Sequence, residues 1–143
     1  MSYEREKLQW VEASASNMTS TADVATFTPS TEVEVYEFGV VITTDLTASD
    51  NLIIAADLRT VAGSDTGRGN GDVGTLTIAA GSSGGIDAGD VIMCRPSAPV
   101  AVSPGEEVVI EVTNAVAAGA GYCFVNYRAL PAPDGSNVTV VTS

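Results

Sequence analysis

Few side chains in this sequence are equipped for chemistry. The chain of 143 residues contains no histidine. Imidazole is the usual general base beside a serine or cysteine nucleophile and a common metal ligand, so both uses are excluded here. The remaining candidates are carboxylates, two cysteines and a glycine-rich segment.

The glycine-rich segment, residues 62–74, contains a tripeptide known from aspartic proteases. In those enzymes an apolar strand leads into the aspartate of Asp65-Thr66-Gly67. Here the small residues Ala62-Gly63-Ser64 precede it. We interpret the match as chance within a loop, because five glycines in this segment favour repeated positive φ or mobility.

The same segment spells a dinucleotide-binding pattern. Gly69, Gly71 and Gly74 follow the spacing G-x-G-x-x-G. A nucleotide site needs this turn between a strand and a helix, whereas an alternating β-pattern follows here. The pattern therefore predicts no cofactor.

Oxygen ligands in this loop leave a calcium site open as a lesser alternative. Asp65, Asn70 and Asp72 are of the type that Ca²⁺ prefers, although their spacing is not that of an EF-hand. We predict no metal-binding residue.

Two pairs of carboxylates lie close in sequence, Asp87 with Asp90 and Glu106 with Glu107. Glycoside hydrolysis requires two carboxylates across a sugar cleft, usually with aromatic platforms. Only eight aromatic residues serve the whole chain. We interpret the pairs as solvated turn acids, predict no catalytic residue, and expect a protein that is not an enzyme.

The two cysteines, Cys94 and Cys123, each fall within an apolar strand pattern. We predict buried free thiols, since cysteine behaves as a small hydrophobe in a reducing compartment. Glycosylation sequons begin at Asn17 and Asn137. They have little meaning without secretion.

Composition limits the partners. The net charge of −12 opposes binding to nucleic acid or to an anionic membrane. No apolar run is long enough for a spanning helix, and no secretory signal is visible. We therefore expect synthesis in the cytoplasm. With 45% apolar and only 17% charged residues, the chain is expected to hide part of its surface in an assembly.

Short alternating segments separated by turn residues cover most of the chain and predict an all-β protein. The predicted strands span residues 9–15, 22–28, 32–44, 52–61, 75–79, 90–95, 100–102, 106–113 and 122–129, and residues 137–142 suit a last strand. This number predicts an antiparallel β-sandwich of jelly-roll type. An immunoglobulin-like sandwich is the nearest alternative, but no Cys-Trp-Cys arrangement supports it.

Several local features can be predicted in more detail. Pro104-Gly105 makes a turn before residues 106–113, and the small residues 117–121 are expected to connect to residues 122–129. We expect these two strands to supply the middle of one sheet. The segment 90–95 is expected to be a buried strand. The apolar face of residues 32–44 changes near Tyr36, which predicts either a β-bulge or a strand that passes from one sheet environment to another.

We predict one domain, residues 1–143, with a sandwich core at 21–130. Residues 1–20 are expected to form an extended N-terminal arm, with Trp10 favouring a docked arm. Residues 131–143 are expected to form a C-terminal strand or tail.

Three stretches resemble the capsid decoration, or cement, proteins of tailed bacteriophages: VYEFGVVIT from Val35, AADLRTVAGSDTGRGNGDVGTLTI from Ala55 and VSPGEEVVIEVTNAVAAGAGYCFVNYR from Val102. The similarity covers about residues 30–130 and consists of strand and turn phrases. It implies a jelly-roll sandwich, often a homotrimer, that binds major capsid protein on the outside of the virion. There it stabilises the head shell against the pressure of packaged DNA, and terminal arms commonly tie neighbours together. No functional residue carries over.

Two other functions stay open. A carbohydrate-binding or receptor-binding head appendage would need exposed aromatic platforms or a calcium loop, for which residues 63–74 are the place to look. An enzyme that works with carboxylates alone is the third possibility.

Overall fold

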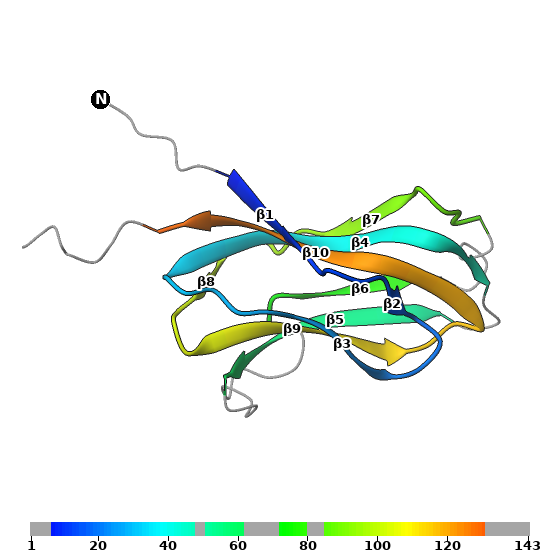
Figure 1. Cartoon of the computed structure of the whole chain (residues 1–143), viewed down its shortest axis with the longest axis horizontal. Helices are drawn as coiled ribbons and strands as arrows, with labels where there is room; N and C mark the ends of the chain where they lie inside the picture. Colours follow the sequence, from blue (N-terminus) through cyan, green and yellow to red (C-terminus); the bar gives the residue numbers. More distant parts are fainter. Residues whose placement is uncertain (1–6, 48–50, 62–71, 80–84, 131–143) are drawn as a thin grey trace, which may run out of the picture.

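Two antiparallel sheets pack face to face in the computed structural model, which describes residues 7–47, 51–61, 72–79 and 85–130. The first sheet has the order β1 (Lys7–Val11), β10 (Ala118–Ala129), β4 (Val33–Thr47), β7 (Val91–Cys94), with β2 (Ser16–Asn17) beside β10 and β8 (Val100–Val102) beside β4. The second sheet has the order β3 (Ala22–Phe27), β9 (Glu106–Asn114), β5 (Leu52–Thr60), β6 (Gly74–Ile78). In Figure 1, β10 and β4 cross the upper part of the view, and β9 and β3 cross the lower part.

The order of the strands is that of a jelly roll. β1 and β2 act as one strand along β10, and β7 and β8 act as one along β4, so each sheet has four members. The chain passes from one sheet to the other at every connection except that between β5 and β6. An immunoglobulin sandwich instead keeps several successive strands in one sheet. The predicted fold class, an antiparallel β-sandwich of jelly-roll type, is confirmed.

The core lies between the inner faces, which follow the alternation in the sequence. Fully buried side chains include Leu52, Ile54, Ala56 and Leu58 of β5, Val108, Ile110 and Val112 of β9, and Cys123 and Val125 of β10. Each set is spaced by two residues, as expected for strands that cover a core with one face.

The predicted bulge is present at Tyr36. In the pairing of β10 with β4, Asn126 lies opposite Glu37 and Tyr127 lies opposite Val35, so Tyr36 has no partner. This extra residue changes the phase of β4. Both Val35 and Phe38 therefore face the core, although three positions separate them.

Two predictions about β9 and β10 were wrong. The strands β9 and β10 each have a central place, but in different sheets. Residues 118–121, expected to be part of a connection, belong to β10. They are small because β10 passes close to β4: a Cβ atom at Gly121 would overlap the side chain of Val40, and one at Gly119 would overlap Leu46.

Strand β7 is not buried, contrary to prediction. It is the edge of the first sheet, and Val91 and Met93 point outward. The alternation of apolar residues identified the strand correctly. It could not show that one face of β7 has no partner element within the described residues.

Most of the predicted N-terminal arm lies on the sandwich of its own chain. β1 pairs with β10 over five residues, from Lys7 opposite Arg128 to Val11 opposite Phe124. Trp10 packs on the ring of Phe27, with 5.5 Å between ring centroids, and Met18 is fully buried. The predicted tail, residues 131–143, falls outside the described residues.

Trp10 and its neighbour Val11 test whether β1 is an integral strand. We expect Trp10→Ala to lower the free energy of unfolding by about 2 kcal/mol, because a half-buried aromatic loses its contacts with Phe27. Val11→Ala is the control on the outer face and should cost less than about 0.5 kcal/mol. Urea unfolding measures both changes in free energy. It should be followed by the circular dichroism of the backbone, because fluorescence would change when Trp10 is replaced. Equal small losses would contradict the docking of β1.

Candidate functional site

Most of the residues weighed for chemistry in the glycine-rich loop lie outside the described residues. These are Asp65, Thr66, Gly67, Gly69, Asn70 and Gly71. The sequon residue Asn137, in the C-terminal segment, also lies outside the described residues. Two members of the loop motifs are described. Gly74 begins the strand β6, as the prediction of a β-pattern required, and Asp72 accepts a hydrogen bond from the backbone N–H of Leu58 at 3.2 Å.

The paired carboxylates stabilise turns. Asp90 accepts a hydrogen bond from the N–H of Asp87 at 2.9 Å. Glu106 accepts one from the N–H of Ser103 at 3.0 Å, across the Pro104-Gly105 turn. In the part of the chain that the structure describes, no three cysteine or acidic residues gather as a metal site would require.

Both described cysteines are free thiols, as predicted. Cys123 is buried in the core, and desolvation raises the pKa of its thiol to about 12, although the neighbouring side chain of Ser16 acts in the opposite direction. Cys94 is only half-buried, so the prediction of burial was wrong for this residue. Its edge position on β7 explains the exposure. Asn17 is exposed in β2 and accepts a hydrogen bond from the N–H of Thr19 at 3.0 Å.

The outer face of the first sheet carries an apolar patch. We define the apolar patch as Val11, Val91, Met93, Tyr122 and Phe124. Val11 lies opposite Phe124, which lies opposite Gly39, which lies opposite Met93. The next row runs from Tyr122 through Val41 to Val91. Side chains directly opposite one another share a face, so the first row crosses all four strands of the sheet and the second crosses β10, β4 and β7.

Exposure distinguishes this patch from the rest of the surface. Among the described residues, five large hydrophobic side chains are exposed: Val11 (46%), Val61 (54%), Val91 (52%), Met93 (48%) and Tyr122 (37%). Four of the five belong to the apolar patch. Scattered exposed hydrophobes are ordinary, whereas a cluster on one face indicates a contact surface.

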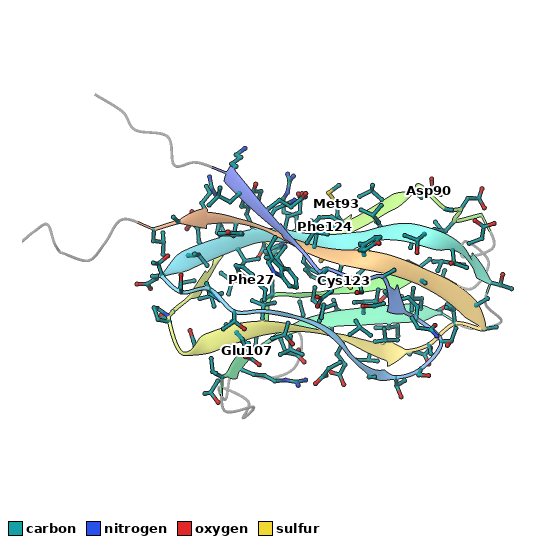
Figure 2. All side chains as sticks on the ribbon, in the orientation of Figure 1. Phe27, Asp90, Met93, Glu107, Cys123 and Phe124 are labelled. Atoms are coloured by element: carbon teal, nitrogen blue, oxygen red, sulfur yellow. The ribbon has the colours of Figure 1, made fainter. Side chains whose placement is uncertain are left out.

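Phe124 forms the centre of the patch and lies over Gly39. A Cβ atom at Gly39 would be 2.8 Å from Cζ of Phe124 and 2.9 Å from Cα of Met93. The missing side chain thus makes room for the ring, and Phe124 is only 3% exposed although it points away from the core. Figure 2 shows Phe124 and Met93 on the outer side of the first sheet, with Phe27 and Cys123 below them.

A polar ladder borders the apolar patch. It runs from β1 through β10 and β4 to Arg95, the residue that follows β7. The amide of Gln9 donates to Asn126 at 2.8 Å, the amide of Asn126 donates to Glu37 at 2.7 Å, and Arg95 donates to Glu37 through Nη2 at 2.7 Å and Nε at 3.2 Å. The carboxylate of Glu37 is almost fully buried and both of its oxygens are bonded.

The ladder keeps Glu37 ionised. Burial alone would raise the pKa of its carboxyl, but the hydrogen bonds from Arg95 and Asn126 and the charges of Arg95 and Lys7 together hold that pKa below the ordinary value. The row is therefore a fixed, charged strip and not a proton-exchanging site at neutral pH.

Beyond the ladder the same face is hollowed into a basic groove. We define the basic groove by its lining residues, Lys7, Tyr36, Arg95, Pro96, Ser97, Pro99 and Arg128. Its volume is about 280 Å³. The ring of Tyr36 lies 5.8 Å from Nζ of Lys7 and 5.0 Å from Cζ of Arg128.

A second groove, of about 230 Å³, lies at the edge of the sandwich and is aromatic. Trp10, Phe27 and Tyr127 line it together with the connection from β3 to β4, residues 28–31. The ring centroids of Phe27 and Tyr127 are 4.8 Å apart. The connection contributes three residues that carry hydroxyl groups, Thr28, Ser30 and Thr31, to the lining of the groove.

No protein-family model, curated protein or solved structure matches this chain. In the described residues, no helix is long and apolar enough to cross a membrane.

The alternation within residues 122–129 places Tyr122, Phe124, Asn126 and Arg128 on one face of β10, which is the outer face of the first sheet. This alternation is visible in the sequence. It did not identify that face as a surface of interest. The feature of the sequence that could have pointed to this face is the change of phase at Tyr36, because a bulge often marks a functional part of a sheet.

The polar ladder predicts a pH-dependent effect of Glu37→Gln. A lowered pKa in the folded protein means that the carboxylate stabilises the fold above about pH 4.5, the ordinary value, and that this contribution is lost as pH falls through the folded-state pKa. We expect the substitution to cost about 1–3 kcal/mol at pH 7 and less towards pH 3. Urea unfolding across this range measures the difference. A cost that does not change with pH would contradict the role of the charge.

Proposed function

We propose that this protein is a non-enzymatic virion structural protein, a decoration or cement protein that binds the outside of a phage capsid and stabilises the head shell. Its partner is the major capsid protein, and it acts as a homo-oligomer, with a trimer favoured. The resemblance in the strand and turn phrases suggests this role. The observation that carries it is the apolar patch on the outer face of the first sheet.

The patch suits contact with a rigid protein surface. It crosses four paired strands, which spans roughly 14 Å at the usual strand spacing. Its backbone is fixed by ladder hydrogen bonds, so few degrees of freedom are lost when a partner covers it. Burying exposed valine and methionine side chains then contributes about 25 cal/mol per Å² of apolar area.

Modest contacts of this kind are sufficient on a capsid. A lattice presents many copies at fixed spacing, and an oligomer that contacts several subunits gains from effective concentration. The net charge of −12 keeps decorated particles apart from one another and from nucleic acid. Stabilisation of the shell requires binding across joints, and no reaction.

Met93→Glu tests the proposal. Met93 is exposed on the edge strand β7, so the substitution should leave the fold intact. We expect binding to undecorated, expanded phage capsids to weaken about 100-fold or more, because a charge would be buried in an apolar contact. The measurement is co-sedimentation with capsids, together with the temperature of capsid disruption.

Val61→Glu is the matched control, since Val61 is equally exposed but lies outside the apolar patch. It should bind and stabilise capsids like the unchanged protein. Absence of binding by the unchanged protein at micromolar concentration would contradict the proposal. If Met93→Glu and Val61→Glu bind capsids equally well, the apolar patch is not the surface that contacts the capsid.

The aromatic groove favours a second candidate function, a carbohydrate-binding or receptor-binding head appendage. Sugar rings stack on aromatic faces, and hydroxyl groups beside the rings can satisfy sugar hydroxyls. Trp10, Tyr127 and the hydroxyls of residues 28–31 provide both. This site was not anticipated, since residues 63–74 were the only place expected to hold a glycan.

A glycan array separates the two functions. If the protein is an appendage, we expect selective glycan binding that Thr31→Val weakens several-fold, because one hydroxyl of the groove is lost without a change of volume. Binding that disappears with a chelator would point instead to a calcium loop. A clean negative on the array favours the cement function.

A further inference from the structure

We propose that the basic groove binds a carboxylate on an acidic segment of a partner protein. The ligand is an aspartate or glutamate side chain on an extended peptide. This inference rests on the groove alone and does not depend on binding to a capsid.

The groove concentrates positive charge in an otherwise acidic chain. Only six basic residues are present in the sequence, against eighteen acidic ones. Three of the six, Lys7, Arg95 and Arg128, line this one hollow. Such clustering, on a protein with a net charge of −12, creates the site where an anion would be least repelled.

Two of these cations are paired with carboxylates. Arg95 is bonded to Glu37, and Nε of Arg128 lies 3.3 Å from Glu34. The three cations and these two carboxylates together leave one positive charge. A single carboxylate neutralises that charge, whereas a phosphate group would bring a charge closer to −2.

Donors remain available for such a ligand. The side chain of Arg95 is 72% exposed, and it bonds Glu37 through Nε and Nη2, so Nη1 points to no acceptor among the described residues. The ammonium of Lys7 contacts only the ring of Tyr36 within the described part of the chain. Both groups can donate to a bound carboxylate with little desolvation cost.

The lining of the groove indicates a peptide. Pro96, Pro99 and the ring of Tyr36 give apolar walls beside the cations, and Ser97 adds a hydroxyl. The volume of about 280 Å³ is at the lower end for small-molecule sites. It suits one or two side chains of an extended segment.

Titration of the full chain with an acetylated, amidated Gly-Asp-Glu-Asp-Gly peptide tests the inference. We expect amide shifts in the NMR spectrum centred on Lys7, Tyr36, Ser97 and Arg128. The neutral peptide Gly-Asn-Gln-Asn-Gly is the control and should cause none. Raising the ionic strength from about 0.01 to about 0.15 M should weaken binding several-fold, because the screening length shortens from about 30 to about 8 Å.

Lys7→Glu and Lys7→Arg make a matched pair of variants. Lys7 is exposed, so neither should disturb the fold. Charge reversal is expected to weaken peptide binding about tenfold, and the arginine variant should retain it. Arg95 is not a suitable choice, because its loss would leave the buried carboxylate of Glu37 without its cation.

The inference is overturned if the acidic peptide causes no shifts, if the neutral peptide binds equally, or if Lys7→Glu binds like the unchanged protein. Stronger shifts with inorganic phosphate than with the acidic peptide would assign the groove to a phosphate instead and would also overturn it. Because Met93→Glu lies in the apolar patch, it should keep the peptide shifts. Failure of capsid binding and failure of this inference are thus distinguishable.

Discussion

The bulge at Tyr36 is the constraint on which both faces of the first sheet depend. A regular strand would place residues 35 and 38 on opposite faces. With one extra residue, Val35 and Phe38 both fill the core, while Glu34, Tyr36 and Glu37 all reach the outer face. The same backbone irregularity thus completes the core and gathers the aromatic ring and the two carboxylates that hold Arg95 and Arg128.

The two outer faces of the sandwich have different character. Among the described residues of the second sheet, Arg59 is the single cation, and it lies 2.8 Å from Asp23, 3.4 Å from Asp57 and 3.6 Å from Glu111. The hydrogen bond with Asp23 is the main reason that the pKa of Arg59 is raised. Three acids around one arginine give this cluster a net negative charge, although Asp57 within it is almost fully buried. The first sheet combines an apolar patch with residual positive charge, and for this reason we propose that its outer face makes the contacts.

The sequence allowed the fold to be predicted because its strongest signals are local. Alternation identified the strands of the core, and the change of phase identified the bulge at Tyr36. The pairing of strands was harder, since Gly119 and Gly121 resemble turn residues until their approach to Leu46 and Val40 is known. The site needed distant residues to meet: Lys7, Tyr36, Arg95 and Arg128 come from four separate strands or loops. The spacing of these residues in the sequence does not indicate that they lie close together in the fold.

The polar ladder explains how an apolar patch and a charged groove can share one face. Gln9, Asn126, Glu37 and Arg95 satisfy one another across the sheet, so a partner that covers the patch does not have to supply hydrogen bonds at its border. An isolated Glu37 there would carry a large desolvation penalty on binding. Both oxygens of Glu37 are already hydrogen-bonded within the chain and removed from water in the folded protein. Binding of a partner therefore adds little further desolvation of this carboxylate. A protein surface can then bury the exposed side chains of Val91 and Met93 while Arg95 and Lys7 stay accessible in the groove, and the two contacts can be made independently.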